Sequence, residues 1–172
     1  MKMPDMKGYR IILITGAVNS GKTSGLAQWT KHLKSGGVGV AGVLAHAVFN
    51  EEGLKCGYDA EDVSTGERRI LARMDSLPGD VTMGRFRFST EGMQFARRAV
   101  EAICNAATIG VVDEIGPLEL SGGGLHTAVK KVLAAPPEHL VLVVRKTLIE
   151  DVSRYYNLTD FLVWPEGNWC AR

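Results

Sequence analysis

The sequence IILITGAVNSGKT, residues 11–23, sets the architecture expected for this chain. It opens with a continuous apolar run that ends at a glycine, which is typical of a strand buried on both faces of a parallel sheet. Residues 16–23 fit the pattern GxxxxGK(S/T), and Leu26, Trp29 and Leu33 then recur at helical spacing. A strand, a glycine-rich loop and a helix are therefore predicted in that order.

The loop of residues 16–23 carries the groups that a bound triphosphate needs. Its glycines let the backbone curl, so that successive N–H groups and the helix N-terminus can point at phosphate oxygens. Lys22 is expected to reach the β and γ phosphates, and the Thr23 hydroxyl to ligate Mg²⁺. ATP or GTP is thus the expected substrate, with Mg²⁺ as the cofactor. The residues predicted to bind the nucleotide here are Gly16, Ala17, Val18, Asn19, Ser20, Gly21, Lys22 and Thr23.

A second apolar run, residues 109–113, ends in the carboxylate pair Asp113-Glu114. Ligands of an open α/β sheet sit beyond the carboxyl ends of its strands, so Asp113 is expected beside the Mg²⁺ held by Thr23, as a ligand acting through water. Glu114 is expected to point the other way and to polarise the water that attacks the γ-phosphate. A helix cap or a solvated loop is the alternative for such a pair.

The rest of the chain alternates between strand and helix patterns. A turn at residues 50–53 between two short apolar runs predicts a β-hairpin, and residues 59–85 are rich in loops around one strand near 69–72. The other predicted elements are strands over 38–45, 140–144 and 160–164, and helices over 90–106 and 147–156 with a short one ending near 135. The pattern predicts a single α/β domain over residues 1–172, a three-layer P-loop NTPase fold whose mainly parallel sheet has helices on both faces and a β-hairpin insertion.

Composition narrows the class of protein. The chain has 172 residues, of which 45% are apolar and 23% charged, as in globular domains, and its 20 basic and 19 acidic residues leave a net charge of +1. So small a charge gives no reason to expect nucleic acid or a membrane surface as a partner. Its three cysteines form no CxxC pair, and the first apolar run is too short for a signal or a membrane span. We expect a cytoplasmic protein that binds a nucleoside triphosphate, with any protein partner left open.

Together with residues 16–23, the run VDEIGPLEL at 112–120 resembles the small nucleoside-triphosphatase family of P-loop NTPases, which has thermophile and human members. The resemblance implies slow hydrolysis of nucleoside triphosphates to diphosphate and phosphate, with little base preference. It carries over Lys22, Thr23, Asp113 and Glu114 in the roles given above. The chain departs from the family at residues 45–49, which lack a Thr-Glu-Glu-Val-Arg-like segment, and at residues 168–169, where the family has an Asn-Arg pair.

Other side chains have two interpretations each. Arg145 follows the strand over 140–144, and a cation there either neutralises charge on the γ-phosphate or is an ordinary solvated strand end. Asn168 and Trp169 follow the last strand, where the tryptophan either stacks on any base or covers apolar surface. For Glu119, stabilising a loop is favoured over sharing a water with Glu114.

Four functions fit a phosphate-binding loop. The first is a nucleoside-triphosphatase. The second is a small-molecule or nucleotide kinase, which needs an acceptor pocket and a lid whose motif is not found in residues 59–99. The third is a regulatory GTPase, since residues 113–116 fit DxxG, although no NKxD motif occurs. The fourth is a binding module that holds a nucleotide with negligible turnover.

Overall fold

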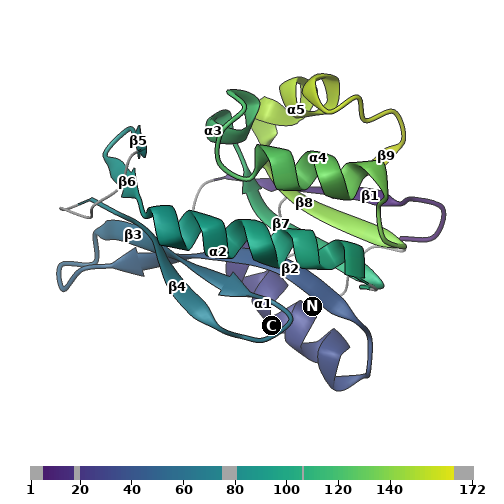
Figure 1. Cartoon of the computed structure of the whole chain (residues 1–172), viewed down its shortest axis with the longest axis horizontal. Coiled ribbons are helices and arrows are strands. Elements are labelled where there is room, and N and C mark those ends of the chain that lie inside the picture. Colours follow the sequence, from purple (N-terminus) through teal and green to yellow (C-terminus); the bar gives the residue numbers. More distant parts are fainter. Residues whose placement is uncertain (1–5, 18–19, 75–80, 106, 165–172) are drawn as a thin grey trace.

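The computed structural model describes residues 6–17, 20–74, 81–105 and 107–164 of the chain. The strands in these ranges form one nine-stranded sheet in the order β5-β6-β4-β3-β2-β7-β8-β1-β9 (Figure 1). The strands are β1 (Ile11–Gly16), β2 (Val40–Phe49), β3 (Lys55–Asp62), β4 (Arg68–Arg73), β5 (Val81–Met83), β6 (Phe86–Phe88), β7 (Ile109–Ile115), β8 (His139–Arg145) and β9 (Phe161–Trp164). The helices are α1 (Lys22–Ser35), α2 (Thr90–Glu101), α3 (Pro117–Leu120), α4 (His126–Ala134) and α5 (Ile149–Tyr155), with single 3₁₀ turns at Ala102–Asn105 and Lys146–Leu148.

The parallel part of the sheet is β2-β7-β8-β1-β9, and helices cover both of its faces. The first apolar run forms β1, in which Ile12, Leu13 and Ile14 are fully buried. On one face, Leu26 and Trp29 of α1 pack in a cluster with Ile12 and Ile14. On the other face, Leu13 belongs to a larger cluster with residues of α2 and α4 (Figure 1). The predicted three-layer α/β fold is confirmed.

The antiparallel part of the sheet is larger than the hairpin predicted from the sequence. β2 does not stop at residue 45: it pairs in parallel with β7 through residues 40–43 and runs on to Phe49 as the antiparallel partner of β3. β4, β6 and β5 then extend the same sheet. At Gly42 the strand is tightly packed against β7, because a Cβ there would lie 1.9 Å from the carbonyl oxygen of Val111, and its φ of 127° favours glycine.

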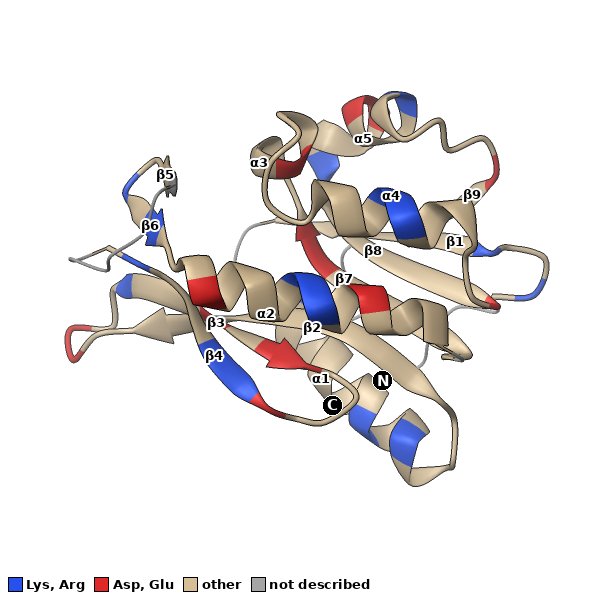
Figure 2. Ribbon diagram, in the orientation of Figure 1, with Lys and Arg blue, Asp and Glu red and all other residues tan. Residues whose placement is uncertain are grey.

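The parallel strands bring three separate segments of the chain to one edge of the sheet. Gly16, at the end of β1, is in register with Arg145 at the end of β8. β7 pairs with β8 on the side away from β1, and Asp113 and Glu114 lie near its end. Figure 2 shows the acidic colour at the tip of β7. No helix within the described ranges is long and apolar enough to cross a membrane.

Candidate active site

The loop between β1 and α1 leads directly into the first turn of the helix. Gly21 has φ 84°, a left-handed conformation that favours glycine, and α1 begins at Lys22 with no side chain capping its N-terminus. Ser20, Gly21, Lys22 and Thr23 line a pocket of about 250 Å³. The N–H groups of an uncapped first turn are an anion site by themselves, so the loop is suited to phosphate. Val18 and Asn19 lie outside the described residues.

Lys22 holds the two sides of this loop together. Its ammonium Nζ donates to the carbonyl oxygens of Gly16 at 3.2 Å and Ala17 at 2.5 Å, and to Ser20 Oγ at 3.2 Å. The charge therefore lies inside the curl of the loop, where phosphate oxygens are expected. Substituting Lys22 removes loop contacts as well as a charge.

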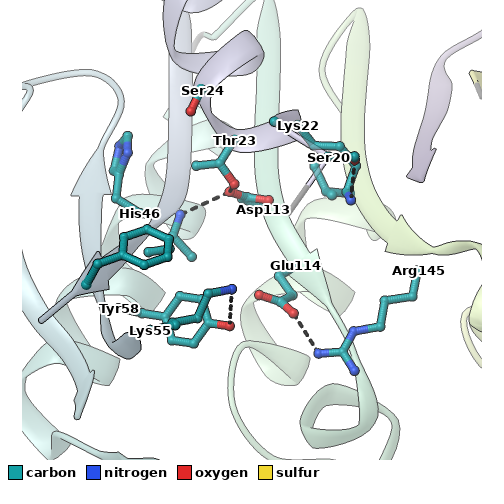
Figure 3. A pocket seen from close by; sticks show the side chains of 15 residues that line it. Ser20, Lys22, Thr23, Ser24, His46, Lys55, Tyr58, Asp113, Glu114 and Arg145 are labelled. Atoms are coloured by element: carbon teal, nitrogen blue, oxygen red, sulfur yellow. Dashed lines mark hydrogen bonds and ion pairs between the residues drawn. The ribbon is translucent and has the colours of Figure 1, made fainter. Parts of the chain in front are cut away.

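Thr23 and Asp113 meet in the same pocket, although they come from α1 and β7 (Figure 3). Thr23 Oγ1 donates to Asp113 Oδ2 at 2.7 Å, and the backbone N–H of Ala45 donates to the same oxygen at 3.2 Å. Asp113 is only 4% exposed. Burial raises the pKa of its carboxyl from 3.8 to about 6, against the opposing effect of these two hydrogen bonds. The protein keeps a carboxylate where solvation is poor, an arrangement favourable for a cation.

The donor set of this pair fits Mg²⁺. A threonine hydroxyl and a carboxylate are hard oxygen ligands, which Mg²⁺ prefers. No group of three or more His, Cys, Asp or Glu side chains in the described ranges could hold a metal ion without other ligands. Mg²⁺ needs no such cage, because it commonly binds one or two protein oxygens together with substrate phosphates and water. The residues present fit a magnesium ion that arrives with a triphosphate.

Glu114 lies in a bulge of β7 rather than in regular strand. Its φ is 67°, one of two positive values among the non-glycine residues of the described ranges, and the register between β7 and β8 shifts between Val112 and Ile115. A regular strand would turn Asp113 and Glu114 to opposite faces, as expected from the sequence, but here both line the same pocket. Left-handed backbone costs about 1–3 kcal/mol at such a residue, and strained backbone of this kind clusters at functional sites.

Arg145 pairs with Glu114. Its Nη2 donates to Glu114 Oε1 at 2.8 Å, and the two side chains are 45% and 37% exposed (Figure 3). Arg145 is therefore not an isolated solvated strand end: it lines the pocket and fixes one carboxylate oxygen of its neighbour.

The antiparallel hairpin contributes pocket residues that sequence reasoning missed. His46 and Phe49 of β2 and Lys55 and Tyr58 of β3 all line the pocket. Lys55 Nζ donates to Tyr58 Oη at 3.4 Å (Figure 3). Burial, followed by the charge of Arg68, lowers the pKa of His46. The turn at residues 50–53 predicts the hairpin, but not that its first strand is the continuation of β2, which brings these side chains to the phosphate loop.

Glu119 belongs to the loop beside the site. It is 5% exposed, and its two carboxylate oxygens accept from the backbone N–H groups of Gly116 at 3.0 Å and Leu125 at 3.2 Å. Burial raises the pKa of this carboxyl. Glu119 thus stabilises the turn after β7, in line with the role favoured from the sequence. Asn168 and Trp169 lie outside the described residues, and their roles at the base stay predictions.

Replacing Asp113 by Asn is expected to stabilise the fold at neutral pH. The folded carboxyl, with its pKa raised from 3.8 to about 6, binds a proton more tightly than the unfolded one, so its burial costs stability increasingly as the pH rises from about 4 to about 6. Asn carries no charge and avoids this cost, which is about 2–3 kcal/mol at neutral pH. Urea unfolding at a series of pH values measures it.

Asp160→Asn, at an exposed position, is the control for that experiment and should unfold like the parent protein. If Asp113→Asn were less stable than the parent at neutral pH, burial of the charged Asp113 carboxylate would not be destabilising the fold.

Comparison with known proteins identifies relatives over nearly the whole chain. Residues 11–164 match the model of a family described as NTPase. The Nucleoside-triphosphatase THEP1 of Methanothermobacter thermautotrophicus is 30% identical over 158 residues, covering 90% of this chain and 87% of the relative. The protein of that name from Sulfolobus acidocaldarius is 30% identical over 145 residues, covering 84% and 82%.

A solved structure gives the same result for the fold. The crystal structure of THEP1 from the hyperthermophile Aquifex aeolicus matches with a TM-score of 0.70, covering 91% of this chain and 89% of that one, at 18% identity. The resemblance drawn from residues 16–23 and 112–120 is confirmed. Since the family match runs from β1 to β9 and the two relatives named above align over more than four fifths of their length, this chain belongs to the NTPase family.

Proposed function

We propose that this protein hydrolyses nucleoside triphosphates, ATP and GTP among them, to the diphosphate and phosphate with Mg²⁺ as cofactor. The observation that carries the proposal is the convergence of the phosphate loop, the Thr23–Asp113 pair and Glu114 on one pocket. Membership of the NTPase family and the names of the relatives support hydrolysis over phosphoryl transfer to another molecule.

The phosphate loop and the first turn of α1 would bind the triphosphate. The N–H groups of the first helical turn and the Lys22 ammonium take the β and γ phosphates. Thr23 and Asp113 would hold Mg²⁺, which when bound neutralises charge on the phosphate oxygens. These residues orient the triphosphate with its γ-phosphoryl group toward the end of β7.

Glu114 would act as the general base. Water attacks the γ-phosphorus and its proton passes to the Glu114 carboxylate, while the bond from that phosphorus to the β–γ bridging oxygen breaks and the diphosphate leaves. Arg145, already hydrogen-bonded to Glu114 at 2.8 Å, positions the carboxylate, and its remaining N–H groups would stabilise the developing charge on the γ-phosphate.

We propose a cytoplasmic location. The three cysteines form no CxxC pair, which fits a compartment where thiols stay reduced.

A panel of the four common nucleoside triphosphates tests this function. Phosphate release should require Mg²⁺, should stop with excess chelator and should differ little between bases. Nucleotide binding without phosphate release, with or without cell extract, would instead identify a nucleotide-dependent binding module.

A further inference from the structure

A second pocket, larger than the first, lies beyond Glu114 on the side away from the phosphate loop. Its volume is about 410 Å³. The walls come from β3, β4, the β5–β6 pair, α2 and the loop after β7, and the apolar side chains that form them include Tyr58, Leu71, Phe86, Phe88, Met93 and Leu118.

The two pockets meet at the end of β7. Tyr58, Asp113, Glu114 and Arg145 line both of them. The inner end of the second pocket is therefore the wall of the site where water would attack. A water molecule occupies about 30 Å³, so room for the nucleophile alone does not account for a cavity of this size. Its volume lies within the range of small-molecule sites, about 300–1,000 Å³.

The walls of the second pocket suit a ring. Tyr58 and Phe86 contact each other edge to face, with centroids 5.3 Å apart and an interplanar angle of 67°. Phe88 adds an aromatic side chain, and Met83 and Met93 add flexible thioethers that adapt to the shape of a ligand. A planar apolar body is the occupant that such walls favour.

The charged residues at one end of the pocket determine which polar group the ligand can carry. Glu114 and Arg145 form an ion pair there, and the buried carboxyl of Asp113 lies beside them. Arg85, over the ring of Phe86 at 5.4 Å, adds a cation to the lining, whereas Glu119 is occupied by two backbone N–H groups. Carboxylates disfavour an anionic head, and arginines disfavour a cationic one. A hydroxyl satisfies both, because it can donate to Glu114 and accept from Arg145.

We propose that this pocket is a binding site for a small neutral molecule with a ring-sized apolar body and one hydroxyl, which it places at the Glu114–Arg145 pair. Such a ligand occupies the position from which water attacks, so its binding lowers hydrolysis.

Probes that share one ring test the proposal on the parent protein without nucleotide. Benzyl alcohol, toluene, benzoate and benzylamine are titrated while the isotope-labelled methyl groups of the methionines are followed by NMR. Benzyl alcohol should shift Met83 and Met93, which line the pocket, in a saturable way and leave Met6, in the cluster on the other face, unmoved. Its affinity should exceed that of the other three by about fivefold or more, because only its hydroxyl can hydrogen-bond to both Glu114 and Arg145. No saturable shift, or equal affinity for all four, overturns the proposal.

Phe86→Ala supplies an independent check. It removes one aromatic wall and should weaken benzyl alcohol binding by about fivefold or more while leaving hydrolysis in the absence of the alcohol unchanged. Tyr9→Ala, at a 37% exposed aromatic that does not line the pocket, is the matched control and should bind like the parent. Unaltered binding in Phe86→Ala overturns the site. If that variant fails to fold, the probe series still decides. Because binding is measured without nucleotide, its failure is distinct from a failure to hydrolyse triphosphate.

Discussion

Lys22→Ala should lose triphosphate hydrolysis, with a fall in kcat of about 10²- to 10³-fold or more. The Lys22 ammonium lies inside the curl of the phosphate loop, within 3.2 Å of the carbonyl oxygens of Gly16 and Ala17, and supplies a positive charge at the site of charge development. Phosphate release by the purified variant measures the effect. Hydrolysis at the parent rate would disprove the assignment of residues 16–23 to the phosphate.

Lys22 stabilises the empty loop as well as supplying a positive charge. The control must therefore also be a lysine that hydrogen-bonds to a loop. Lys34→Ala meets this need: Lys34 is on the same helix, and its Nζ donates to the carbonyl oxygens of Val63 at 2.6 Å and Ser64 at 2.8 Å, away from the pocket. It should lose some stability and keep its hydrolysis. Equal loss of hydrolysis in both variants would point to a structural cause.

Glu114→Gln should reduce kcat by about 10²- to 10⁴-fold with little change in triphosphate affinity. Glutamine keeps the size of the side chain and can still accept from Arg145, but it cannot take a proton from the attacking water. Rates under saturating triphosphate, together with a direct binding titration, separate the two quantities.

Glu119→Gln is the matched control, since Glu119 is a second carboxylate on the same turn that holds the backbone N–H groups of Gly116 and Leu125. It should leave turnover within a few fold of the parent. Full turnover in Glu114→Gln together with none in Glu119→Gln would show that Glu119, not Glu114, is the general base.

Local patterns predicted the parts of the site that lie at the ends of single elements. The apolar run before Gly16 and the helical spacing after Lys22 specify a strand, a loop and a helix without reference to other segments. Asp113 lies next to Thr23 because the carboxyl ends of parallel strands share one edge of the sheet, while its role toward Mg²⁺ stays a prediction.

What the sequence could not predict depends on register between distant strands. Glu114 was expected on the face opposite to Asp113, but the register between β7 and β8 shifts between Val112 and Ile115, and Glu114 adopts left-handed backbone. Glutamate is not a residue type that signals this conformation. Lys55 and Tyr58 reach the pocket because β2 runs on past residue 45 to pair with β3. The turn at residues 50–53 predicted that these two strands pair, but no local pattern showed that the first of them continues β2.

Hydrolysis in water enriched in the heavy isotope of oxygen tests most directly whether Glu114 activates water against the γ-phosphorus. Attack by water that Glu114 activates should give phosphate that carries one solvent oxygen, diphosphate that carries none, and a rate of labelling that falls in Glu114→Gln as kcat falls. Label in the diphosphate, or phosphate released without solvent oxygen, would contradict it.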